Sequence, residues 1–262
     1  MSVETSIDQA RTRIEVEQRA VDAKLDAIEE FVDRVGDLST DPVPSSTAGP
    51  IGTGAGLVRA EAAPEDHCRT VRTVFAETIR PHSVADVDDP EPLLETVRTE
   101  LSDEIAVALA PTTDTVFTAE LEQAVLSAAT RLRAETAVLR RAIVREDAHL
   151  DAAAATVDDV TGWIADADET PLTDLGFDPL WQRHEALARH RDRCDTLAER
   201  RQAFLRGTTN EGVEVGIRHR RLVPYLYREL PVDHPLLATV VRLDDACAEC
   251  QRAVRDHLTR RA

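Results

Sequence analysis

The fold class of this chain is decided by residues 3–38, VETSIDQARTRIEVEQRAVDAKLDAIEEFVDRVGDL. Apolar residues recur there at every seventh position, giving the row Ile7, Ile14, Val21, Ile28 and Val35. A seven-residue apolar repeat with a charged exterior is typical of a coiled-coil helix. We therefore predict one helix over residues 3–38, which ends near Gly36 and is stopped by Pro42.

Residues 39–63, STDPVPSSTAGPIGTGAGLVRAEAA, are rich in Pro, Gly, Ser and Thr and predict a flexible linker. Beyond it, apolar periodicity and Pro positions predict helices over residues 64–80, 91–109, about 113–168, 179–206, 222–230 and 235–260. The longest should begin with Thr113 or Asp114 as its N-cap, and Asp178 should cap the helix that follows.

Together these elements predict an all-α fold, with long antiparallel coiled-coil helices and a smaller C-terminal helical module. The predicted divisions are an N-terminal heptad helix (1–38), the flexible linker (39–63), a helical or coiled-coil region (64–170) and the C-terminal module (171–262).

The charge composition favours a protein from a very salty cytoplasm. The formal net charge is −18, from 49 acidic and 31 basic residues, and Lys24 is the one lysine. Molar salt shortens the Debye length to roughly 3 Å and screens an acidic surface. A GC-rich genome also favours Arg over Lys, but it does not explain the excess of acids. We expect no signal peptide, because the N-terminus lacks an apolar core, and no membrane helix.

Four residues of the C-terminal module form a candidate zinc site. Cys247 and Cys250 are spaced i, i+3 on one predicted helix, and His190 and Cys194 are spaced i, i+4 on another. Two such helices side by side could supply four tetrahedral ligands. The alternative is that these cysteines pack in the core, since each falls on the apolar stripe of its helix. Beyond that zinc ion, we predict no cofactor.

An arginine cluster in the same module is a candidate nucleic-acid surface. Residues 177–262 hold 16 basic and 13 acidic residues, whereas residues 1–176 carry a net charge of −21. The candidate contacts are Arg189, Arg193, Arg218, Arg220 and Arg221. The alternative is that this basic face pairs with acidic residues of the chain itself. Molar salt would also weaken phosphate contacts.

Two further patterns have structural interpretations. Glu146-x-x-His149 resembles half of a di-iron site, but no second such motif occurs, so we predict a solvated helix face. The aromatic residues of the C-terminal module are predicted to form its core, with a partner-binding patch as the alternative; they are Trp181, Phe204, Tyr225 and Tyr227.

No catalytic motif is recognisable, so we predict a non-enzymatic interaction or scaffold protein. It would bind a protein partner, or associate with itself, through the heptad helices. The alternative is a zinc- or thiol-dependent regulator that binds nucleic acid through residues 183–221. The segment PVDHPLLATVVRLDDACAECQRAVRDHL, residues 231–258, resembles a haloarchaeal, all-helical domain family of unknown function. That resemblance implies a helical, acidic protein and assigns no activity or ligand.

Overall fold

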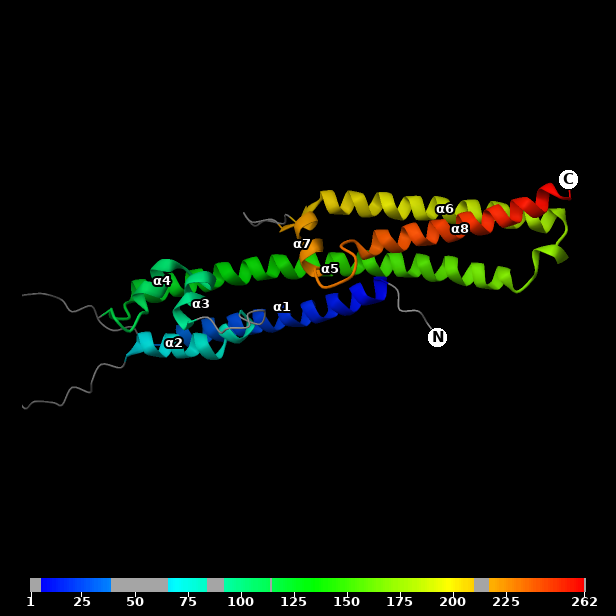
Figure 1. Cartoon of the computed structure of the whole chain (residues 1–262). Coiled ribbons are helices and arrows are strands. Elements are labelled where there is room, and N and C mark those ends of the chain that lie inside the picture. The colour runs from blue at the N-terminus through cyan, green and yellow to red at the C-terminus, as the bar shows by residue number, and fades with distance from the viewer. Residues whose placement is uncertain (1–5, 39–65, 84–91, 114, 210–216, 262) are drawn as a thin grey trace, which may run out of the picture. The chain divides into compact units, whose positions relative to one another are not determined.

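The computed structural model describes residues 6–38, 66–83, 92–113, 115–209 and 217–261 (Figure 1). Helices dominate these residues, so the predicted all-α class is confirmed. The helices are α1 (Ser6–Gly36), α2 (His67–Glu77), α3 (Leu93–Glu100), α4 (Asp103–Ala108), α5 (Ala119–Asp168), α6 (Phe177–Arg206), α7 (His219–Leu226) and α8 (Pro235–Thr259). Short 3-10 turns η1 (Arg80–His82) and η2 (Leu172–Asp174) and a two-residue antiparallel pair, β1 (Thr208–Thr209) with β2 (Ile217–Arg218), join them.

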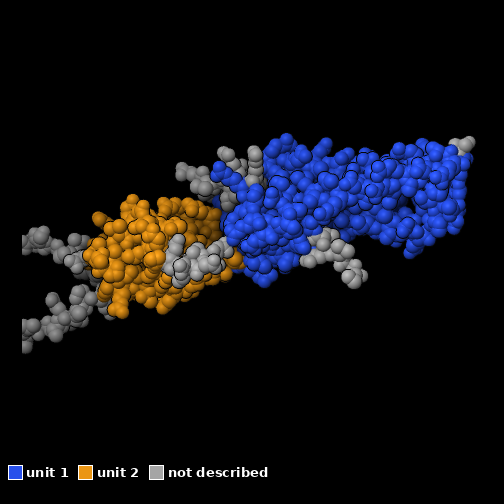
Figure 2. All heavy atoms as spheres, in the orientation of Figure 1, with its two compact units in different colours: residues 1–19, 138–262 blue, residues 20–137 orange. Residues whose placement is uncertain are grey.

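The chain forms two compact units (Figure 2). Unit 1 comprises residues 1–19 and 138–262, and unit 2 comprises residues 20–137. The division into 1–38, 39–63, 64–170 and 171–262 stays a prediction, and the linker lies outside the described residues. Within the described ranges, no helix combines the length and the apolar character that a membrane-spanning segment requires.

The seven-residue row of α1 is buried inside a single chain. All five of its apolar members are buried. In unit 1, Arg11 pairs with Asp151 of α5 at 2.8 Å, and Gln18 Nε2 donates to Asp147 Oδ2 at 3.2 Å. Residue numbers rise along α1 while those of their α5 partners fall, so the two helices run antiparallel here. The apolar row of α1 is therefore covered without a second chain.

Unit 2 has its core where α1 and α5 meet the short helices α2, α3 and α4. Phe31 and Phe75 are fully buried there, with an edge-to-face contact at 5.8 Å between ring centroids. Lys24 belongs to the same unit and contacts both carboxylate oxygens of Glu100, at 2.8 and 2.9 Å. The one lysine of the chain thus links α1 to α3.

The predicted helix over residues 91–109 is wrong, because it is two helices. α3 ends at Glu100, and Ser102 adopts an extended backbone between α3 and α4. The Ser102 side chain accepts a hydrogen bond from the backbone N–H of Ile105, so it caps α4. Serine is among the strongest N-cap residues, and its capping role outweighed an apolar period that continues through the break.

Two predicted helix starts are also corrected. α5 begins at Ala119, where the Thr118 hydroxyl accepts from Leu121 N. Thr113 instead donates to the Ala110 carbonyl at 2.7 Å and closes the preceding turn, while Asp114 lies outside the described residues. α6 begins at Phe177 with Gly176 as its N-cap, so Asp178 lies in the first turn.

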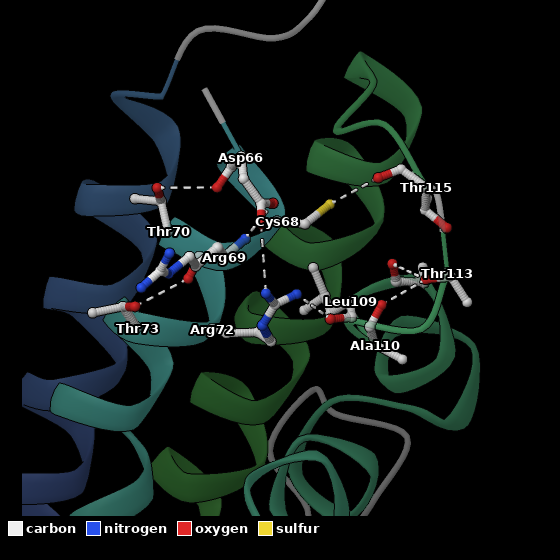
Figure 3. A network of polar contacts seen from close by, with 11 residues as sticks. Asp66, Cys68, Arg69, Thr70, Arg72, Thr73, Leu109, Ala110, Thr113 and Thr115 are labelled. Carbon is white, nitrogen blue, oxygen red and sulfur yellow. Dashed lines mark hydrogen bonds and ion pairs between the residues drawn. The ribbon is translucent and has the colours of Figure 1, made fainter. Parts of the chain in front are cut away.

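A polar network ties α2 to the segment between α4 and α5 (Figure 3). Asp66 caps α2 by accepting from Arg69 N at 2.9 Å. Arg72 donates to the Leu109 carbonyl at 2.5 Å, which satisfies the C-terminal end of α4. Cys68 lies in the same network and donates to the Thr115 carbonyl at 3.4 Å. These contacts account for Cys68 as a structural residue of unit 2.

Candidate functional site

The four predicted zinc ligands lie on α6 and α8, the two helices that pack closely in unit 1. Cys194 and Cys247 are buried, and Cys250 is half-buried. Burial raises the pKa of all three thiols, that of Cys194 to about 11, so they are neutral at physiological pH. The described residues contain no group of three or more His, Cys, Asp or Glu side chains placed to hold a metal ion. The zinc site stays a prediction.

The fourth of these residues, His190, contacts other side chains. Its ring lies 4.9 Å from the Trp163 ring, and its Nδ1 lies 3.4 Å from Arg193 Nη1. Burial, followed by the positive charge of Arg193, lowers the pKa of His190. The ring is therefore neutral at physiological pH and packs at the contact between α5 and α6.

Several arginines of α6 are engaged within unit 1. Arg191 forms two hydrogen bonds with Asp244 of α8, at 2.9 and 3.3 Å. Arg193 contacts Asp159 of α5 at 2.6 Å, and Arg183 donates to the Thr170 carbonyl at 3.1 Å. The pairs of Arg191 with Asp244 and of Arg193 with Asp159 agree with the alternative interpretation, in which the basic face pairs with acidic residues of the chain itself.

The other predicted nucleic-acid contacts are either exposed or have side chains outside the described part of the structure. Arg189 on α6 and Arg221 on α7 are exposed. Arg218 ends β2 and Arg220 belongs to α7, and their side chains lie outside the described part of the structure. The nucleic-acid surface stays a prediction.

A buried charged cluster joins α5, α6 and the end of α7; we name Glu146, Arg201 and Tyr227 the buried cluster. Arg201 donates to both Glu146 oxygens, at 2.6 and 2.8 Å, and the Tyr227 hydroxyl donates to Glu146 at 2.5 Å. Glu146 is 0% exposed and Arg201 1%. Burial and the Glu146 carboxylate raise the pKa of Tyr227 far above its usual range, so the hydroxyl stays a donor.

The prediction of a solvated face at Glu146 is therefore wrong. The carboxylate is buried because its two oxygens have three donors from Arg201 and Tyr227. A bidentate arginine is the partner that best offsets the desolvation of a carboxylate. The sequence shows each member of the buried cluster in a different pattern, and only the packing of α5, α6 and the turn after α7 brings them together.

Exposed aromatic rings gather at the start of α6, beside the end of α8. The rings of Phe177 and Trp181 are stacked at 6.5 Å between centroids, and those of Trp181 and His184 at 5.9 Å. Phe177 and Trp181 are each 49% exposed. The rings line a groove of about 330 Å³, which we name the aromatic surface, together with Arg255, Leu258 and Thr259.

The predicted aromatic core is thus only partly correct. Tyr227 is buried, but Trp181 and Tyr225 are exposed. Phe177, Trp181 and His184 are spaced i, i+4 and i+7, so they share one face of α6. That spacing is visible in the sequence, but it does not distinguish a buried face from an exposed one.

An apolar cavity of about 160 Å³ lies nearby, where the ends of α5 and α8 meet the start of α6. Its walls include Trp163 and Ala167 of α5, Leu187 of α6, and Cys250 and Val254 of α8. The half-buried Cys250 thiol therefore contributes to an apolar wall.

Among known proteins, this chain matches one family model, and no activity is assigned to that family. The family model described as a domain of unknown function (DUF7260) matches residues 5–251. No curated protein and no solved structure matches the chain.

Proposed function

This chain belongs to the DUF7260 family of unknown function, and we propose that it is a non-enzymatic interaction protein that binds a partner protein through the aromatic surface of α6 and α8. The single observation that carries the proposal is the stack of exposed rings, Phe177 on Trp181 on His184. Aromatics make up only 3% of this chain, and one of its two tryptophans lies in this stack.

A single exposed apolar side chain is ordinary, but adjacent exposed aromatic rings beside a groove are typical of a binding site. Tryptophan and arginine are the residues most often found at the energetic centre of protein interfaces. The aromatic surface holds both, as Trp181 and Arg255. The i, i+4 spacing on a long helix keeps the rings ordered before a partner binds, which lowers the entropic cost of association.

The lining of the groove specifies the chemistry of the partner. Leu258 forms a buried apolar part of the wall, and Arg255 is the one formally cationic residue among the six that line it. A segment that presents an apolar side chain followed by a carboxylate satisfies both features. We therefore propose an acidic, apolar peptide segment or helix as the bound element.

The surface also suits the salty cytoplasm that the composition favours. Molar salt screens surface charge pairs almost completely, but it does not weaken apolar contacts. Binding that depends on Phe177 and Trp181 would persist there, with Arg255 selecting orientation. The heptad helices were predicted to bind the partner, but the apolar row of α1 is buried within the chain. We therefore keep the interaction role and assign partner binding to the aromatic surface.

The test is affinity capture of the full-length protein from its host, in buffer containing molar potassium chloride. The wild type is compared with Trp181→Ala and with Val241→Ala, a control at another exposed apolar residue of unit 1. We expect one protein, recovered by wild type and Val241→Ala, to be depleted at least tenfold by Trp181→Ala. Equal recovery by all three proteins would refute the proposal.

A further inference from the structure

The apolar cavity lies in unit 1 and has a different lining from the aromatic surface. Its twelve lining residues include none of the six that line the aromatic surface. It lies between the last two turns of α5, the η2 connection, α6 and the C-terminal half of α8. Its volume is about 160 Å³. The apolar cavity and the aromatic surface therefore have separate linings.

Small side chains at the walls create the space. Ala167 of α5 and Ala253 and Cys250 of α8 border the cavity at positions where a leucine would reduce it. The hollow is open to solvent on one side, because Ala253 and Asp168 are exposed, whereas Leu187 and Val254 at its base are buried. An apolar hollow that is accessible from solvent is a place that a small ligand can occupy.

The wall chemistry restricts what can bind. Trp163, Ile164, Leu187 and Val254 present hydrocarbon or aromatic surface, on which water finds few hydrogen-bond partners. The Cys250 thiol is neutral, because burial and the charge of Asp168 raise its pKa. An apolar cavity of roughly 150 Å³ accommodates a benzene-sized molecule. The walls thus favour a compact, neutral and apolar ligand.

The rim carries the polar groups. Asp168 and Arg183 both border the cavity, and Arg183 donates to the Thr170 carbonyl at 3.1 Å, which holds the connection between α5 and α6 over it. Asp168 is exposed, so a ligand's single polar substituent could remain in contact with water at this edge of the cavity.

We propose that the apolar cavity is a binding site for a small neutral aromatic molecule, about the size of a monosubstituted benzene. The ring lies against Trp163 and between Ala167 and Ala253, whose small side chains leave room for it. Binding needs no charge on the ligand and no metal ion.

Trp163 provides a direct reporter of the cavity. In the full-length Trp181→Phe variant it is the one remaining tryptophan, and the probe is bromobenzene, whose bromine quenches a tryptophan on contact. We expect saturable quenching with half-saturation at about 0.1–1 mM, as the ligand efficiency of a seven-atom molecule allows. Adding Ala253→Leu fills the cavity and should weaken binding at least tenfold. The matched control is Ala246→Leu, two turns earlier on the same face of α8 and outside the lining.

Quenching that rises linearly without saturation would overturn the proposal. So would saturable quenching that Ala253→Leu leaves unchanged, because the probe would then bind elsewhere. Far-UV circular dichroism establishes that each variant is folded, and Ala167→Val replaces Ala253→Leu if the latter is not. As a second measurement, bromobenzene should raise the melting temperature of the unfilled protein by a few degrees and that of the filled variant by less than one. Equal shifts would contradict the proposal. Both measurements use purified protein alone, so they are independent of whether a partner protein exists.

Discussion

Replacing Arg201 by methionine tests whether the buried cluster stabilises unit 1. The substitution keeps an unbranched, apolar stem but removes the guanidinium that donates to both Glu146 oxygens, at 2.6 and 2.8 Å. Glu146 would then remain 0% exposed, with the Tyr227 hydroxyl as its one remaining donor among the contacts described. The carboxylate would be buried without the charge that offsets its desolvation.

Two estimates of the magnitude agree. Removing one partner of a buried ion pair costs about 3–5 kcal/mol. Independently, the loss of two hydrogen bonds to a charged group, at about 1.5–3 kcal/mol each, gives about 3–6 kcal/mol. We therefore expect Arg201→Met to lower the free energy of unfolding of unit 1 by about 4 kcal/mol.

The assay is urea unfolding followed by tryptophan fluorescence, which reports unit 1 because Trp163 and Trp181 both lie in it. The matched control is Arg200→Met, at the adjacent exposed residue, where we expect a change below about 0.5 kcal/mol.

A triple variant separates charge burial from packing. Combining Arg201→Met with Glu146→Leu and Tyr227→Phe removes every polar member of the buried cluster together. Because well-packed apolar residues can replace a buried ion pair at little cost, the triple variant should be more stable than Arg201→Met alone. An Arg201→Met protein whose free energy of unfolding lies within about 1 kcal/mol of that of Arg200→Met would contradict a stabilising role of the buried cluster.

Three further outcomes follow from the contacts. Burial raises the pKa of Cys194 from 9.0 to about 11, so above pH 9 the folded state keeps a proton that the unfolded state loses. Unit 1 should therefore lose about 2–3 kcal/mol of stability between pH 9 and 11. Urea titrations should show a smaller loss for Cys194→Ala. Ser102→Ala removes the cap of α4 and should cost about 1 kcal/mol, measured by hydrogen exchange of the Ile105 amide. Arg193→Ala should cost less than about 1 kcal/mol in the same urea assay, because its ion pair with Asp159 is largely solvent-accessible; a larger loss would show that the pair is structurally important.

Sequence periodicity identified the helices that bury a long apolar row. The predicted end of the first helix near Gly36 and the start of the last helix at Pro235 agree with the structure. Periodicity missed the break at Ser102, because the apolar spacing continues through it while the local cap redirects the backbone. Helix starts depend on single hydrogen bonds such as that of Thr118, and several residues nearby could have made them.

The candidate site was harder to predict than the fold, for a physical reason. The buried cluster needs residues separated by 55 and 81 positions, and no local pattern signals that Glu146 will meet Arg201 and Tyr227. The face of α6 that carries Phe177 and Trp181 has the spacing of a core stripe, yet both rings are 49% exposed. Charge patterning did indicate correctly that arginines of α6 pair with acids of the chain, as Arg191 does with Asp244.

Photocrosslinking from position 181 tests the central claim most directly. A photoreactive phenylalanine analogue replaces Trp181 in the full-length protein, and the same analogue at Val241 is the control. We expect a covalent adduct with one partner protein from position 181 alone, through a peptide that contains apolar and acidic residues. No protein adduct from position 181, or the same adduct from position 241, would contradict the assignment of the aromatic surface as the binding site.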